Sequence, residues 1–298
     1  MHTNGLMSDK KAYSVHTTSG MDMDGLIKAI HHTNLGIRWR AALALGDIGE
    51  PAVKPLVHTL KETEDQDVRW LACLALGRIG TAAIPQLIRA MSEDDFDVRW
   101  HATRVLAGMG GPAIEPLIAT LQEEDSDVQW RSAFALSLIG EPAVVHLILA
   151  LKSRKWWVRV RAIWALGEIR DRRAVEPLIQ SMNDQDWYVR WSAADALGKI
   201  GDKRAANCLG KALKESDSFV QVPSIWALGQ LGSEAPVDSL IESLKNTDWY
   251  VRWGAVEALG NIGNNRALDS IRILLDDKDE YVRRAAEEAV RKIKKKKG

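Results

Sequence analysis

Large aromatic rings recur along this chain at a regular interval, at positions where a soluble protein usually carries polar side chains. In most of the repeated segments a tryptophan stands two positions after a recurring valine or isoleucine. Where valine takes that place, a tryptophan stands four positions further on. Indoles that face solvent are enriched in binding hot spots. The pattern predicts a recognition surface formed by Trp39, Trp70, Trp100, Trp130, Trp164, Trp191, Trp226, Trp253 and Phe134. The alternative is that these rings pack against one another and fill a groove.

Charged side chains follow the same face unevenly. Basic residues accompany the aromatic rings in the first five segments, whereas Asp195, Glu257 and Glu288 lie in the later ones. We expect a groove that is basic and aromatic at its start and more acidic at its end, which would orient a partner of matching polarity. Ordinary solvated charges are the alternative. The basic candidates for partner contact are Arg40, Arg104, Arg131 and Arg161.

These residues belong to an internal repeat. The recurring valine or isoleucine lies 30 or 31 residues from the next one at every step. We number positions from this anchor, which is found at Ile37, Val68, Val98, Val128, Val158, Val189, Val220, Val251 and Val282. A period of this length is the signature of a repeat protein, whose units bury their apolar faces by stacking.

Each period predicts two helices. Three residues before the anchor stands Asp or Asn, whose side chain can accept the free N–H groups of a helix's first turn; only Lys155 departs from this, while Asp217 conforms. Apolar residues then follow at helical spacing, and glycine pairs such as Gly198 and Gly201 are expected to end the first helix. Segments such as "RAVEPLIQSM", which begins at Arg173, predict the second helix. Pro223 should kink its helix or delay its start.

Two further positions have structural interpretations. The arginine that follows the anchor in seven segments, for example Arg69, is expected to pair with the helix-start aspartate of a neighbouring repeat. The aromatic pairs that open two helices, such as Trp187 and Tyr188, should pack between repeats. Trp156 and Trp157 follow the exceptional Lys155 and mark the most atypical loop, which is a candidate contact point.

The predicted fold is therefore all-α: a right-handed α-α superhelix, or HEAT/armadillo-like solenoid, of about nine helix-pair units of 30–31 residues. Residues 1–20 are polar and expected to be disordered. Residues 21–297 should form a single solenoid, with an N-terminal half-repeat at 22–33, full repeats from about residue 34, and a capping helix at 279–297.

The sequence resembles the HEAT-like repeats of phycobilin lyases and of many prokaryotic repeat proteins. The phrases that carry the resemblance are "DWYVRWSAADALGKIGDKRAANCLGKAL" from Asp186 and "DWYVRWGAVEALGNIGNNRALDSI" from Asp248, and it covers roughly residues 22–296. It implies that the first helices line the concave face, where the tryptophans would lie. It specifies the architecture strongly and the function weakly.

Three enzyme classes of similar architecture are alternatives. Deoxyhypusine hydroxylase binds iron through His-Glu dipeptides, which this sequence lacks, and its seven histidines are scattered, so no metal or cofactor is expected. A bilin lyase could use a Trp- and Arg-lined groove, but no catalytic residue is marked. A HEAT-like DNA glycosylase needs a basic aromatic face, which the acidic later repeats disfavour.

Composition limits the partners. Lys+Arg and Asp+Glu both total 40, so the net charge of zero gives no general attraction to nucleic acid or anionic membrane. Cys73 and Cys208 form no metal-binding pair, no apolar run of membrane-spanning length is evident, and no signal peptide is evident, so a cytoplasmic location is expected. The leading hypothesis is a scaffold that binds another protein or peptide, with nucleic acid a weaker candidate and no membrane or metal partner.

Overall fold

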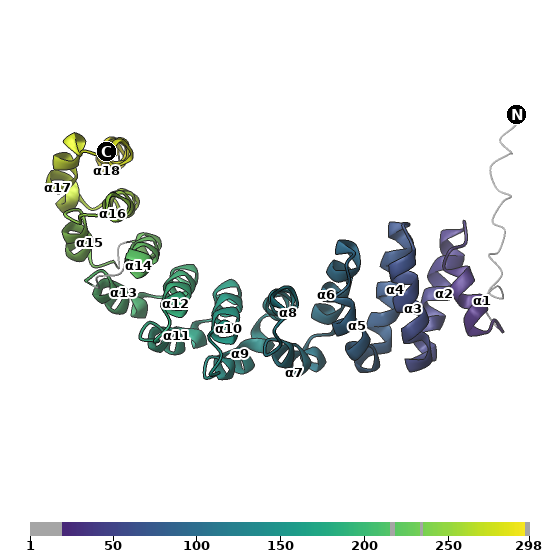
Figure 1. Cartoon of the computed structure of the whole chain (residues 1–298). Coiled ribbons are helices and arrows are strands. Elements are labelled where there is room, and N and C mark those ends of the chain that lie inside the picture. Colours follow the sequence, from purple (N-terminus) through teal and green to yellow (C-terminus); the bar gives the residue numbers. More distant parts are fainter. Residues whose placement is uncertain (1–19, 215–217, 233–234, 296–298) are drawn as a thin grey trace, which may run out of the picture. The chain divides into compact units, whose positions relative to one another are not determined.

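The computed structural model describes residues 20–214, 218–232 and 235–295, and these ranges contain helices and no strand (Figure 1). This confirms the all-α prediction. The expected disorder of residues 1–20 and the helix-start role of Asp217 fall outside the described residues, Gly20 excepted.

Each repeat consists of a long first helix, the A helix, and a shorter second helix, the B helix, often preceded by a 3₁₀ turn. The A helices are α2 (Leu35–Ile48), α4 (Gln66–Ile79), α6 (Phe96–Met109), α8 (Ser126–Ile139), α10 (Trp156–Ile169), α12 (Trp187–Ile200), α14 (Ser218–Leu231), α16 (Trp249–Ile262) and α18 (Glu280–Lys295). The B helices are α1 (Met23–Ala29), α3 (Val53–Glu62), α5 (Ile84–Ala90), α7 (Gly111–Thr120), α9 (Val144–Ala150), α11 (Val175–Ser181), α13 (Ala206–Ala212), α15 (Val237–Ser243) and α17 (Leu268–Ile273). The 3₁₀ turns are η1 (Glu50–Ala52), η2 (Gly80–Ala83), η3 (Glu141–Ala143), η4 (Arg172–Ala174), η5 (Lys203–Ala205), η7 (Asn265–Ala267) and η8 (Leu274–Asp276).

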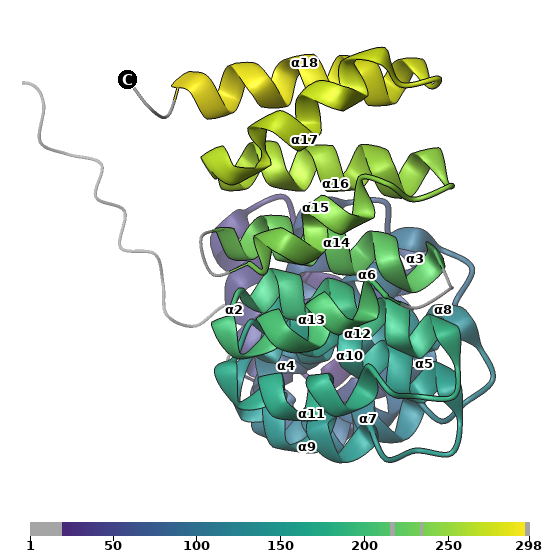
Figure 2. The same ribbon diagram turned by 90° about the vertical axis from the view of Figure 1, so that its left-hand side faces the viewer.

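The chain divides into two compact units, with the boundary between Ala113 and Ile114 inside α7. In the first unit, α2, α4 and α6 are successive A helices, and α2 packs against α4 and α4 against α6. In the second unit the A helices form the inner layer of an arc and the B helices the outer layer (Figure 1). Figure 2 shows α14, α16 and α18 lying one after the other in this unit, with their long axes roughly parallel. The single solenoid over residues 21–297 stays a prediction.

The A helices begin where the sequence predicts. The side chains of Asn34, Asp65, Asp95 and Asp125 each accept backbone N–H groups from the first turn of the helix that follows. The later repeats use aspartates in the same way, while Lys155 gives α10 no side-chain cap. These bonds satisfy donors that have no partner inside the helix, so the cap fixes the register of each repeat.

The two glycines of each pair have different roles, which corrects the expectation that both end the helix. The second one has a positive φ, +70° at Gly201, and follows the last residue of the A helix. The first one lies inside the helix, and in the later repeats it lets the next A helix approach. A Cβ added at Gly198 would lie 2.9 Å from Cα of Ala227 on α14, and the corresponding distance from Gly229 to Ala258 is 3.2 Å.

Pro223 does not delay its helix. It lies buried inside α14, which begins at Ser218 in the same register as the other A helices. The expected delay is therefore wrong. One backbone hydrogen bond is necessarily lost, because proline has no N–H group to donate.

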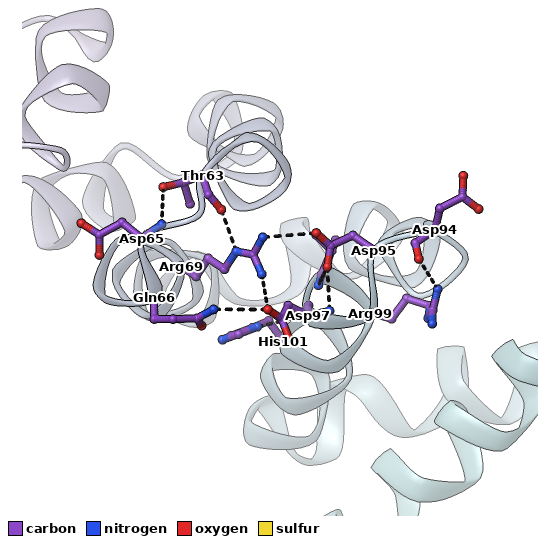
Figure 3. A network of polar contacts seen from close by, with 10 residues as sticks. Thr63, Asp65, Gln66, Arg69, Asp94, Asp95, Asp97, Arg99 and His101 are labelled. Carbon is purple, nitrogen blue, oxygen red and sulfur yellow. Dashed lines mark hydrogen bonds and ion pairs between the residues drawn. The ribbon is translucent and has the colours of Figure 1, made fainter.

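At several positions the arginine after the anchor joins neighbouring repeats, and Arg69 pairs with a helix-start aspartate as predicted. Figure 3 shows Arg69 of α4 between the carbonyl of Thr63, which accepts from Nε at 2.8 Å, and two carboxylates at the start of α6. Those carboxylates belong to Asp95 and Asp97, at 3.2 and 2.6 Å. In the second unit Arg159 instead reaches Asp184, at 2.7 Å, which lies two residues before the helix-capping Asp186.

The segment Gln66–Ala90 has the length and hydropathy of a membrane span, although no such run was expected from the sequence. In the fold it comprises α4, η2 and α5, and Gly80 with φ +74° divides the two helices. Its apolar residues Leu71, Leu76 and Leu87 are fully buried in the repeat core. The hydropathy of this segment therefore serves packing between the helices.

Candidate interaction surface

The aromatic row of the first unit consists of rings from three consecutive A helices. The ring centroids of Trp39 on α2 and Trp70 on α4 lie 5.4 Å apart, at an interplanar angle of 30°. Trp70 is 52% exposed and Trp39 40%, whereas Trp100 on α6 is half-buried. Neighbouring indoles thus touch each other and still present a large apolar area to solvent.

The second unit begins with a three-ring cluster on α8 and α10. Trp130 and Phe134 are one helical turn apart on α8 and stack with their centroids 5.3 Å apart and their planes 4° from parallel. Trp164 of α10 lies 6.1 Å from Trp130 and 6.5 Å from Phe134. Trp164 stands four positions later in its repeat than Trp130 does, so the structure brings together the two tryptophan positions that the sequence treats as interchangeable.

Further along the second unit, tyrosines complete the row. Tyr188 lies 5.7 Å from Trp191 on α12, and Tyr250 stacks on Trp253 of α16 at 5.4 Å. Trp226 of α14 contacts both rings on α16, at 6.1 Å from Tyr250 and 6.5 Å from Trp253. These contacts extend the surface beyond the residues predicted for it.

The two tyrosines are not among the residues predicted for this surface, because the sequence pattern assigns them to packing between repeats. Each tyrosine stands three residues before a tryptophan of the row, and residues three apart share one face of a helix. That spacing was the available signal. The helix-start rings Trp187 and Trp249 do contact aromatic rings of the next repeat, Phe219 at 5.0 Å and Tyr281 at 5.7 Å, yet they remain exposed.

The four arginines predicted to accompany the rings lie in different environments. Arg131 is buried and pairs with Asp127 of its own helix at 3.1 Å. Arg40 is half-buried on α2. Arg104 is exposed on α6 and Arg161 half-buried on α10, and neither has a hydrogen bond or ion pair within the described part of the chain. Arg104 and Arg161 are thus the members of this set best placed to meet an anionic group.

The acidic residues of the later repeats are paired with lysines. Asp195 lies 3.0 Å from Lys199, and Lys292 lies 2.8 Å from Glu288 and 3.8 Å from Glu257. Hydrogen bonding and the nearby charge of Lys292 lower the pKa of Glu288. Much of the expected acidic character is therefore balanced within the fold.

Stacked helix pairs, each too small to bury its own apolar face, define this protein as an α-solenoid repeat protein. The family model for HEAT repeats matches residues 23–99, 84–151, 144–223 and 219–291. The chain belongs to the HEAT repeat family. The finer resemblance to the repeats of phycobilin lyases stays a prediction.

Solved structures with similar folds include an engineered protein, at 24% identity and a TM-score of 0.45 over 91% of this chain and 88% of that one. Human deoxyhypusine hydroxylase in complex with glycerol is 23% identical, with a TM-score of 0.38 over 83% of this chain and 97% of that one. A designed armadillo repeat protein in complex with a (KR)4 peptide is 20% identical, with a TM-score of 0.43 over 70% and 99%. No curated protein matches the chain in sequence.

Proposed function

We propose that this chain is a scaffold that binds a protein or peptide through the exposed rings of its A helices. The observation that carries the proposal is the row of contacting, solvent-exposed indoles. Trp39, Trp70, Trp130 and Trp226 are between 37% and 52% exposed, although each touches another ring. Extended apolar patches on soluble proteins mark contact sites, and covering indoles supplies much of the binding energy at interfaces.

Contact between the rings supports recognition as well as packing. Ring–ring contacts restrict the side chains before a partner arrives, so less conformational entropy is lost on binding. The stack of Trp130 on Phe134 illustrates this, because both rings project from one helix and leave Trp130 accessible. The two interpretations of the aromatic row, groove packing and recognition, can therefore hold for the same residues.

The test uses peptides selected on the full-length chain from a phage-displayed random library. Their affinity is then measured for the wild type and for two paired variants, Trp39→Ala with Trp70→Ala, and Trp130→Ala with Trp164→Ala. Truncation of a hot-spot tryptophan costs 2 kcal/mol or more, so a peptide that contacts one cluster should bind its variant at least about tenfold more weakly.

A matched control removes exposed apolar groups from the B helices. Leu149 on α9 and Ile273 on α17 are exposed, and the variant Leu149→Ala with Ile273→Ala should bind as the wild type does. Circular dichroism should show unchanged helix content in all variants. If no peptide is selected, or if selected peptides bind the tryptophan variants and the wild type equally, the scaffold proposal is wrong.

A further inference from the structure

A pocket of about 330 Å³ opens between α8, α10 and α12 in the second unit. Its apolar walls are Trp156, Trp157 and Val160 from α10 and Tyr188 from α12. Trp156 meets Trp157 edge-on at 6.0 Å and Tyr188 at the same distance. Arg161 also lines the pocket, and Glu124 lies at its rim. Pockets with aromatic walls and a few polar groups are the usual form of a ligand site, and this volume suits one or two side chains.

The pocket lies where the repeat departs from its own pattern. The other described A helices for which a cap is given begin after an Asp or Asn whose side chain caps the first turn. Before α10 that residue is Lys155, and no side chain caps the helix. Lys155 turns back, donating from Nζ to the carbonyl of Gln122 at 2.6 Å, and its Nζ lies 5.3 Å from the ring centroid of Trp157. The capping carboxylate or amide of those repeats is thus replaced by positive charge.

Arg161 is a cation that the fold leaves without an anion. Within the described residues it has no hydrogen bond or ion pair, and it shares the pocket wall with Tyr188. Burial lowers the pKa of Arg161, because the charged guanidinium loses part of its hydration. The neighbouring Arg159, by contrast, pairs with Asp184 at 2.7 Å.

A second donor in the pocket wall also lacks an acceptor. Nε1 of Trp157 is buried and has no hydrogen-bond partner in the described part of the chain. A buried donor that stays unpaired costs free energy, and an incoming acceptor restores it. The guanidinium and the indole N–H can only donate, so the chemistry of the pocket favours a ligand that accepts hydrogen bonds.

We infer that this pocket binds an acidic side chain of a partner peptide together with the apolar residue beside it. The carboxylate would pair with Arg161, whose planar fork suits a two-point contact, and the apolar residue would lie among Trp156, Trp157 and Tyr188. The inference rests on the proposed function, and adds the chemistry of one contact to it.

Nucleic acid fits the pocket less well. The loop before α8 contains Glu123, Glu124 and Asp125 in succession, and Glu124 lies on the pocket rim. A phosphate backbone would bring several negative charges against this loop, whereas a single carboxylate needs to approach only Arg161. A peptide that offers an amide N–H or a basic residue to Glu124 would complement the rim as well.

The experiment measures fluorescence anisotropy with two fluorescein-labelled peptides of equal length, one alternating Leu and Glu and the other Leu and Gln. The full-length wild type is compared with Arg161→Gln and with the matched control Arg89→Gln, which removes from the B helix α5 an exposed arginine that has no ion pair in the described part of the chain. A hydrogen bond to a charged group is worth about tenfold to hundredfold in affinity, so the wild type and Arg89→Gln should prefer the Glu peptide by about that factor. Arg161→Gln should lose the preference. Trp156→Ala, which leaves the charge in place, should weaken binding of both peptides.

Each outcome decides the inference. Equal affinity of the wild type for the two peptides, or a preference that survives in Arg161→Gln, overturns it. Tighter binding of an oligothymidylate than of the Glu peptide, lost in Arg161→Gln, also overturns it and assigns the pocket to phosphate. If library-selected peptides bind through the tryptophans without any acidic preference, the inference fails while the scaffold proposal stands.

Discussion

The side chain of the arginine that follows the anchor residue binds the loop of its own repeat, whether or not it also contacts a neighbouring repeat. Arg69, Arg159 and Arg252 each donate to the backbone carbonyl six residues earlier. Gln129 replaces arginine in its repeat and keeps this bond, donating from Nε2 to the carbonyl of Glu123 at 2.6 Å. The bond to the loop is therefore what the two residue types share, and the ion pair to the next repeat is added where an aspartate is within reach. The ion pairs between repeats therefore add to a hydrogen bond to the loop that a neutral side chain can also make.

Side chains also cap the 3₁₀ turns that precede several B helices. Asp202 accepts from the backbone N–H of Arg204 and from its side-chain Nε and Nη2, at 3.0 Å each. The hydrogen bonds from the side chain and the backbone of Arg204, together with its charge, lower the pKa of Asp202 to about 2. Asn264 occupies the equivalent place before α17 and still accepts from the N–H of Arg266 at 3.0 Å. An amide therefore supplies the cap without the ion pair.

This comparison predicts how Asp202→Asn changes stability with pH. The folded state holds the pKa of Asp202 below its ordinary value, so the aspartate stabilises the fold above about pH 4 and loses that contribution as the pH falls toward 2. The variant should keep the cap and be less stable than the wild type by up to about 1 kcal/mol at pH 7. The difference in urea midpoint should shrink between pH 4 and pH 2. A difference that is constant over that interval would show that the carboxylate charge is not involved.

At the scale of the element, the spacing between A helices is set by small residues. Gly198 faces Ala227, and Gly260 faces Ala289, so that the backbones approach closely. Gly77 occupies the same place in its repeat, yet a Cβ added there would meet nothing within 4 Å. Glycine at the same repeat position thus permits close helix packing in one repeat and has no such role in another.

Gly198→Ala and Gly77→Ala should consequently change stability in opposite directions. Alanine in place of a helical glycine gains up to about 1 kcal/mol from reduced backbone entropy in the unfolded chain. At Gly77 that gain should appear as a higher denaturation midpoint. At Gly198 the new methyl group would lie 2.9 Å from Cα of Ala227, and overpacking against backbone typically costs about 1–3 kcal/mol, so the midpoint should fall. Stabilisation by both substitutions would mean that α12 and α14 separate without cost.

The contrast shows what the sequence could and could not predict. Helix starts, the A/B alternation and the repeat register follow from local rules, because a cap residue and a 3.6-residue stripe act within one helix. Whether a glycine ends a helix or admits a neighbour depends on the next helix, which the local pattern does not specify. The local rule for proline likewise failed at Pro223, because α14 begins in the same register as the other A helices.

Some features of the candidate surface follow from helical spacing, and others do not. Helical spacing predicts that the tryptophans leave the core, and the structure shows them in contact while half-buried or exposed. It does not predict that Arg131 would be buried against Asp127, or that Tyr188 would contact Trp156 of the preceding repeat. Those contacts depend on rotamers and on side chains from adjacent repeats.

At the scale of the whole molecule, charge is balanced both in number and in place. Lys+Arg and Asp+Glu both total 40, and ion pairs such as Lys199 with Asp195 and Arg252 with Asp277 hold opposite charges together. A partner held mainly by the exposed rings releases few counterions, because apolar contact does not displace condensed salt. The balanced charge of the chain and its aromatic surface therefore both predict that affinity for a partner depends only weakly on salt concentration.

We expect the affinity for a library-selected, uncharged peptide to change less than about threefold between 50 and 200 mM salt. A protein that makes several phosphate contacts loses about 10³–10⁵ in affinity over the same interval. Peptide binding is measured by anisotropy and duplex DNA binding by gel shift, each at both salt concentrations. DNA that binds more tightly than any selected peptide, with the steep salt dependence of phosphate contacts, would contradict the scaffold and favour the nucleic-acid alternative. If peptide binding depends only weakly on salt and is lost in the variant Trp39→Ala with Trp70→Ala or in Trp130→Ala with Trp164→Ala, the indoles themselves supply the binding energy.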